Sequence, residues 1–151
     1  MKSLMEKYNL SPHPEGGYFK EVFRSELKVN SPHAQTPRNA ATHIYFLLMR
    51  GQVSRFHRVV HDEIWHFYQG DALKLILYDG KRVREEIIGP GAHVLVVQAG
   101  TWQAADPLGE YSLVGCTVAP GFDFKDFSFL ADTPDSVSEF GRAHEKYKKY
   151  L

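Results

Sequence analysis

The chain has a single cysteine, Cys116, among its 151 residues, so it cannot form an internal disulfide. It also lacks any apolar stretch near the ~20 residues of a membrane span, and it has no amino-terminal apolar run typical of a signal peptide. These absences predict a protein of a reducing compartment, with the cytoplasm as the expected location. No cationic residue stands beside Cys116, which indicates a buried, inert thiol.

An excess of charge of either sign is also absent, because 18 Lys and Arg residues balance 18 Asp and Glu residues. No net positive field is available to attract nucleic acid or an anionic membrane surface, so neither is predicted as a partner. The Gly-x-Ser-x-Gly elbow, the Cys-x-x-Cys pair, the His-Glu-x-x-His helix and the Walker loop are missing too. The sequence therefore gives no support to hydrolase, thiol-redox, zinc-protease or NTPase activity.

Short runs of β-forming residues separated by turn residues make up most of the chain. This spacing is typical of an all-β sandwich or barrel, and 151 residues are expected to form a single domain. The barrel is predicted over about residues 17–130. Its clearest strands are expected at Tyr18 to Arg24, Thr42 to Met49, Leu73 to Tyr78, Val83 to Ile88, His93 to Gln98 and Tyr111 to Val118.

Two helices are expected outside these strands. One short helix is predicted at residues 2–8, before a loop that contains two prolines and a glycine pair. The other is predicted over about residues 134–150, because Thr133 is a suitable N-cap, Pro134 suits the first helical position, and apolar residues follow at helical spacing. The row of aromatic residues at 122–129 is interpreted as an extended segment that packs on the core.

The stretch from Gly51 to Gly70 concentrates the residues that can carry chemistry. His57 and Glu63 lie six residues apart, and a turn near His61 would bring the second strand back so that Glu63 lies beside His57. On a regular strand after Glu63, Trp65 and Phe67 would share the inward face of the carboxylate, and His66 would point outward. One imidazole and one carboxylate are therefore predicted to meet at one point.

This spacing resembles the first motif of the cupin superfamily, which reads Gly, five residues, His-x-His, three or four residues, Glu, six residues, Gly. Gly51, His57, Glu63 and Gly70 match it, whereas Val59 stands in place of the second histidine. The second cupin motif, Pro-x-Gly-x-x-His, is best matched at residues 98–103, where Gln103 replaces the histidine.

A closer resemblance extends over nearly the whole chain, to the uncharacterised DUF985 branch of cupins, also called Cupin_5. The segments that carry it are Pro12 to Phe19, Phe56 to Val59, Asp62 to Tyr68 and Val118 to Phe124. The resemblance implies a double-stranded β-helix, the cupin jelly-roll barrel, usually paired as a homodimer and without an agreed activity.

A metal site is the first functional hypothesis, since metal-binding cupins use the motif histidines as ligands. His57, Glu63 and Gln103 would be the ligands here, with His61 or His66 as a further donor. A divalent ion such as Zn, Fe, Mn or Ni would be the cofactor.

Metal-free acid-base chemistry is the second hypothesis. The nucleotide-sugar epimerases of the cupin superfamily carry a base histidine on the equivalent strand, and this chain is similar to them around His57 and over Gly17 to Glu21. The resemblance implies that His57 removes a proton next to a carbonyl, that Glu63 orients it, and that a tyrosine donates. Tyr18 and Phe19 would contact the substrate.

Arg24 is the predicted anchor for an anionic group of the substrate, because its fork matches a carboxylate or a phosphate. On a regular strand it would share a face with Tyr18, Lys20 and Val22. The other interpretation of Arg24 is a solvated charge at a sheet edge.

A non-enzymatic barrel that binds or senses a small polar or anionic metabolite is the third hypothesis. Trp65, Phe67 and Trp102 would form its apolar walls, and His57, Glu63 and Gln103 would orient the ligand. The remaining alternative is that His57 and Glu63 form a hydrogen-bonded pair in the core.

Overall fold

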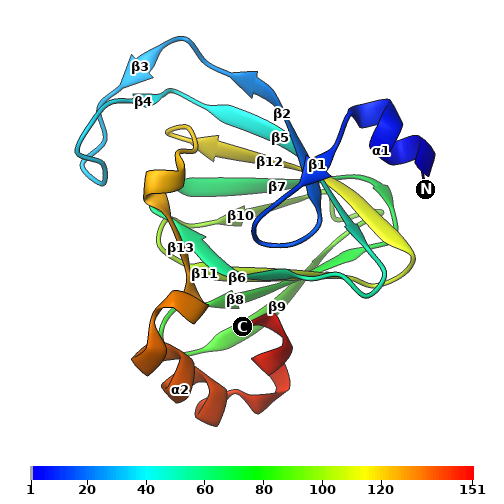
Figure 1. Ribbon diagram of the computed structural model, residues 1–151, viewed down its shortest axis with the longest axis vertical. Coiled ribbons are helices and arrows are strands. Elements are labelled where there is room, and N and C mark those ends of the chain that lie inside the picture. The colour runs from blue at the N-terminus through cyan, green and yellow to red at the C-terminus, as the bar shows by residue number, and fades with distance from the viewer. Residues whose placement is uncertain (1) are drawn as a thin grey trace.

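The computed structural model describes residues 2–151, which fold into a barrel of two facing antiparallel β-sheets (Figure 1). The six-stranded sheet contains β1 (Ser11–Pro12), β2 (Tyr18–Arg24), β5 (Thr42–Met49), β12 (Tyr111–Ala119), β7 (Asp62–Gly70) and β10 (Val94–Val97), in that order. The five-stranded sheet contains β13 (Phe127–Phe129), β6 (Ser54–Val59), β11 (Trp102–Pro107), β8 (Leu73–Tyr78) and β9 (Val83–Ile88). The predicted all-β fold is confirmed.

A further pair of short strands, β3 (Lys28–Val29) and β4 (Arg38–Asn39), extends beyond the barrel beside β2 and β5 (Figure 1). This pair lies within the segment between β2 and β5. The helices in the described part of the chain are too short or too polar to cross a membrane.

The inward side chains divide the barrel interior into a filled half and a hollow half. Along β5, Phe46 and Leu48 are buried in the main hydrophobic cluster, whereas Thr42 and Ile44 line a cavity. Because alternate residues of a strand face the same side, each inward strand supplies apolar packing at one end and cavity wall at the other. The sequence thus builds the site and its support on the same strands.

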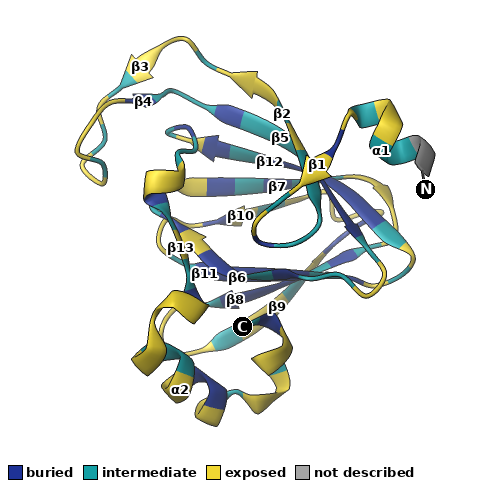
Figure 2. Cartoon of the chain, viewed as in Figure 1, coloured by how far each residue is buried: buried dark blue, intermediate teal, exposed yellow. Residues whose placement is uncertain are grey.

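The outer face of the five-stranded sheet is covered by the carboxy-terminal segment (Figure 2). There, Phe140 and Tyr150 are buried against Phe56, Ile76 and Trp102. The prediction of one helix over residues 134–150 is wrong beyond Ala143. Helix α2 (Pro134–Ala143) ends at His144, and the 3₁₀ helix η3 (Glu145–Tyr150) follows. This break lets both aromatic side chains reach the sheet.

The outer face of the six-stranded sheet is covered only in part. Helix α1 (Lys2–Tyr8) packs on one end of it, where the ring centroids of Tyr8 and Tyr45 lie 4.9 Å apart. Across the rest of this face, one row of cross-strand neighbours contains, strand by strand, Phe23, His43, Thr117, Ile64 and Val96. Phe23 and Val96 are 54% and 49% exposed, so this row ends in uncovered apolar side chains.

A β-bulge changes the face that Arg24 occupies. The pairing of β2 with β5 shifts between Glu21 and Phe23, so Arg24 lies on the inward face with Phe19 and Glu21. The predicted face shared with Tyr18 is therefore wrong, because an extra residue in a bulge reverses the alternation that follows it.

The aromatic segment after β12 is also less regular than predicted. The 3₁₀ helix η1 (Phe124–Asp126) interrupts it before β13, and a second 3₁₀ helix, η2 (Leu130–Asp132), leads into α2. The Asp123 side chain caps η1 by accepting the backbone N–H of Lys125 at 2.9 Å. The segment is therefore extended only at its end.

Candidate functional site

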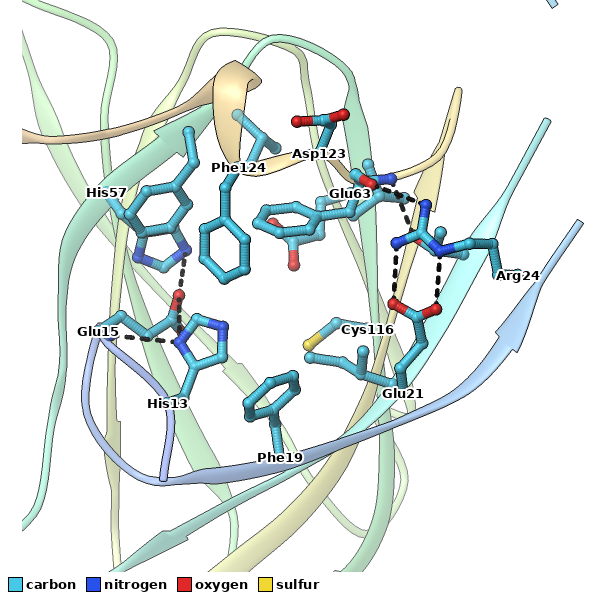
Figure 3. A pocket seen from close by; sticks show the side chains of 16 residues that line it. His13, Glu15, Phe19, Glu21, Arg24, His57, Glu63, Cys116, Asp123 and Phe124 are labelled. Atoms are coloured by element: carbon cyan, nitrogen blue, oxygen red, sulfur yellow. Dashed lines mark hydrogen bonds and ion pairs between the residues drawn. The ribbon is translucent and has the colours of Figure 1, made fainter. Parts of the chain in front are cut away.

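The hollow half of the barrel is a cavity of about 350 Å³ between the two sheets (Figure 3). Its size is within the usual range for small-molecule sites. It is lined by His13, Glu15, Phe19, Glu21, Arg24, Thr42, Ile44, His57, Val59, Glu63, Cys116, Val118, Phe122, Asp123, Phe124 and Phe127.

His57 and Glu63 reach this cavity from different sheets. His57 lies on β6 of the five-stranded sheet and Glu63 on β7 of the six-stranded sheet, so the two strands face each other across the barrel instead of pairing. Both side chains are buried, at 2% and 7% exposure. Both side chains therefore line the same cavity, but the predicted return of the second strand beside the first, which would place Glu63 next to His57, is wrong.

A tight turn before β2 adds two further polar side chains, His13 and Glu15. The backbone N–H of Gly16 donates to the carbonyl of His13, and the N–H of Arg55 donates to the carbonyl of Glu15 at 2.8 Å. Gly16 has φ +113°, which an L side chain rarely adopts. This turn holds the Glu15 side chain inside the barrel.

Glu15 and His57 form a close pair of titratable groups in the cavity. Nδ1 of His57 lies 2.8 Å from the carbonyl oxygen of Arg55, an acceptor only, so Nδ1 carries a proton and donates. Nε2 of His57 then faces Oε2 of Glu15 at 3.2 Å. A hydrogen bond there requires one more proton, which the two side chains share.

Burial decides where this shared proton resides. Burial lowers the pKa of His57 and raises the pKa of Glu15, and in both cases it is the largest effect. A neutral Glu15 carboxyl that donates to a neutral His57 is therefore the favoured arrangement. Ser54 donates to the other carboxyl oxygen at 2.7 Å and fixes its orientation.

Glu63 is held by a chain of two side chains from the wall behind it. The indole N–H of Trp65 donates to Oε1 of Gln103 at 2.8 Å, and Nε2 of Gln103 donates to Oε2 of Glu63. Because an indole nitrogen can only donate, it fixes which way the Gln103 amide points. Gln103 is thus committed to orienting Glu63.

The environment of Glu63 brings its titration into the neutral range. Burial is the main cause that raises the pKa of Glu63 to about 7, and Glu15 raises it further, against the opposing effects of His57, Gln103 and Cys116. Burial also raises the pKa of the Cys116 thiol, well above its usual value. Cys116 is therefore a protonated donor beside Glu63, in agreement with the prediction of an inert thiol.

Arg24 lies at the opposite side of the cavity, in a fork with Glu21 (Figure 3). Its Nε and Nη2 each donate to a Glu21 carboxylate oxygen at 2.8 Å. Its Nη1 donates to Oδ1 of Asn39 at 2.9 Å and to the carbonyl of Phe122 at 3.1 Å. The guanidinium thus ties β2 to β4 and to the loop after β12.

The remaining predicted site residues are only partly brought to the cavity. Phe19 lines it, whereas Phe67 packs against the main core cluster. Tyr18 packs beside helix α1, and Trp102 lies under the carboxy-terminal helices, with the Arg58 guanidinium 4.4 Å from its ring centroid. Tyr18 and Trp102 therefore face away from the cavity.

The ligand set predicted for a metal ion is not assembled. Gln103 already uses its oxygen for Trp65. His61 instead contacts Oγ of Ser31 at 2.7 Å, and His66 contacts Oγ1 of Thr117 at 3.0 Å on the outer face. Among residues 2–151, no group of three or more His, Cys, Asp and Glu side chains is arranged to hold a metal ion. The donors present do not fit the metal hypothesis.

Sequence reasoning missed part of the lining. Glu15 and His13 were treated only as part of a loop, although a carboxylate and an imidazole two residues apart beside a glycine pair are a signal of a constrained polar turn. Phe122, Phe124 and Phe127 were interpreted as packing, yet all three line the cavity, and Phe124 is 54% exposed.

Two facing sheets with a buried imidazole and carboxylate inside them define a cupin-type double-stranded β-helix. The chain matches the model of the Cupin superfamily (DUF985) over residues 2–130. It therefore belongs to the DUF985 family of cupins.

Individual relatives cover most of the chain. The uncharacterized protein YML079W of Saccharomyces cerevisiae is 31% identical, and the match covers 86% of this chain and 75% of the yeast protein. A hypothetical protein from Leishmania major has a TM-score of 0.87 and 31% identity, covering 99% of this chain and 97% of its own. Protein SO0799 from Shewanella oneidensis has a TM-score of 0.84 and 28% identity, covering 99% and 95%. The names of these relatives assign no activity.

Proposed function

We propose that the protein binds a small polar metabolite in the barrel cavity and moves a proton on it, as an isomerase or epimerase does. Three titratable groups on the walls of one cavity carry this proposal. Glu15 and His57 share one proton, and Glu63 has a pKa of about 7. A pKa near the working pH is the property that general acid-base catalysis needs.

The proton movements follow from these protonation states. Ionised Glu63 accepts a proton from a carbon next to a carbonyl group, and the proton shared by Glu15 and His57 moves to the carbonyl oxygen. The C–H electron pair becomes part of an enol. Glu63 then returns its proton to the neighbouring carbon, or to the other face of the same carbon, while an enol O–H proton goes back to the Glu15–His57 pair. The product carbonyl forms and the protein groups are restored. His57 thus acts together with Glu15, in place of the solitary base that the sequence predicted.

Solvent deuterium exchange tests this function. Ligands would first be found by thermal shift among sugars, sugar nucleotides and small carbonyl compounds, since ligand binding to the native state raises its stability. A bound compound should then acquire deuterium from D₂O. Glu63→Gln and His57→Gln should each slow this exchange by about 100-fold or more.

The matched control for this test is His93→Gln, which changes an exposed histidine outside the cavity and should leave the exchange unchanged. Unaltered exchange in both cavity variants would contradict the proposal. Binding without exchange in any compound would favour the non-catalytic binding barrel instead.

We further propose that two copies pair through the uncovered outer face of the six-stranded sheet. Val94 and Val96 on β10 and Phe23 on β2 are exposed there, and large exposed apolar side chains at both ends of one sheet face favour an interface. Light scattering after gel filtration should give the mass of a dimer, and Val96→Lys should give a monomer. Ile87→Lys, an equally exposed position on β9, should remain a dimer. A monomeric wild type would contradict this proposal.

A further inference from the structure

The titratable side chains around the cavity are mainly acidic. Four acidic side chains line it, of which Glu15 is the neutral partner of His57, while Arg24 is its one guanidinium or ammonium group among the described residues. The two lining histidines add little positive charge, because burial lowers the pKa of both His13 and His57. The acidic residues are Glu15, Glu21, Glu63 and Asp123.

Arg24 is not free to balance this charge. Both oxygens of Glu21 accept hydrogen bonds from it, and Asn39 and the Phe122 carbonyl occupy Nη1. An anionic ligand would compete with Glu21 for the guanidinium, most of whose N–H groups already donate within the protein. The Arg24–Glu21 pair therefore closes the anion site that the sequence predicted.

Glu63 and Asp123 face ligand space and form no ion pair among the described residues, although Arg24 and Arg38 act on Asp123 electrostatically at longer range. The Glu63 carboxylate is held by an amide and a thiol. The Asp123 carboxylate accepts a backbone N–H. Ionisation of a buried carboxylate is favoured by a cation close to it, so a positively charged ligand would stabilise the ionised form of Glu63.

Aromatic rings form an independent part of the cavity wall. The Phe122 and Phe124 rings flank Asp123 in sequence and meet edge to face, with centroids 4.9 Å apart. The Phe127 centroid lies 6.0 Å from that of Phe124, and Phe19 lines the opposite side (Figure 3). The negative faces of such rings attract organic cations.

We propose that the cavity selects a metabolite that carries an organic ammonium group, held by the phenylalanine rings with Asp123 and Glu63. This inference rests on the proposed function, because it names the charge of the ligand in the same cavity. The substrate class is then an aminated carbonyl compound. Its carbonyl end would lie near the proton shared by Glu15 and His57.

Three probes of similar size and different charge test the proposal directly. Benzylamine is a cation, benzyl alcohol is neutral and benzoate is an anion, and their binding can be followed by NMR shifts of the cavity residues. Benzylamine should bind about tenfold more tightly than benzyl alcohol, and benzoate should bind most weakly.

Variants locate the preference within the cavity. Asp123→Asn and Glu63→Gln should each weaken benzylamine binding several-fold while leaving benzyl alcohol binding almost unchanged. Asp123 lies in a loop, so its substitution tests the proposal even if Glu63→Gln disturbs folding. Glu139→Gln removes an exposed carboxylate of α2 and should change none of the three affinities.

Three results would overturn the inference. They are benzoate binding as tightly as benzylamine, an unchanged preference in both cavity variants, and no binding of any probe at millimolar concentration. None of these measurements uses proton transfer, so failure of the charge preference is distinct from failure of the exchange test.

Discussion

Titration of Glu63 should lower the stability of the wild type by roughly 3 kcal/mol between about pH 5 and about pH 8, and Glu63→Gln should remove this loss. In the folded state the pKa of Glu63 is about 7, compared with an unperturbed 4.5. The folded state therefore binds this proton more tightly than the unfolded chain does. The resulting stability is fully present below the unfolded pKa and is lost as pH rises through the folded pKa.

Urea unfolding at a series of pH values measures this effect as the difference between wild type and variant. The difference is the useful quantity because His13 and His57, whose pKa values are lowered by burial, change stability with pH in the opposite direction. The introduced amide oxygen can still accept from Gln103, so the fold should be retained. Parallel pH profiles for the two proteins would show that Glu63 titrates normally and would remove the basis for its role as a base.

Gly16→Ala should destabilise the protein by about 3 kcal/mol or more and disturb the cavity. A Cβ on Gly16 would overlap the carbonyl oxygen of Val53, and the φ of +113° is itself unfavourable for alanine. The turn would have to move, and it carries Glu15. The hydrogen-bonded contact between Glu15 and His57 should therefore be lost together with stability.

Gly91→Ala is the matched control for this substitution. Gly91 has φ +90°, but a Cβ there meets nothing within 4 Å. This variant should be destabilised only by the unfavourable left-handed backbone of the alanine, which costs about 1–2 kcal/mol. Urea unfolding gives both stabilities, and NMR titration of the His57 ring reports on its contact with Glu15. Equal losses of stability in the two variants would mean that the turn at Gly16 can rearrange at little cost.

The part of the site that lies within one motif could be predicted from the sequence. His57 and Glu63 belong to consecutive strands joined by a short turn, so the sequence brings both to one cavity, although the strands lie in facing sheets and do not form the predicted hairpin. Glu15 comes from a distant turn, and only its contact with β6 at Arg55 brings it beside His57. Tertiary contacts of that kind leave no periodicity in the sequence.

Predictions failed where a strand or helix departs from regular geometry. Alternation predicts that Arg24 shares a face with Tyr18, and one bulge after Glu21 reverses this. Helical spacing continued through Tyr147, but the chain leaves the α-helix at His144. In both cases the residue types suit the predicted element, and packing against neighbouring strands decides the actual path.

The outer faces of the two sheets are covered unequally, and this limits how copies of the protein can assemble. Helix α2 and η3 cover much of the outer side of the five-stranded sheet, while a large part of the outer side of the six-stranded sheet is uncovered. If two copies pair through this face about a twofold axis, the contact buries the same face on both molecules. The proposed dimer contact would therefore be self-terminating, because the helices cover much of the opposite side of each copy.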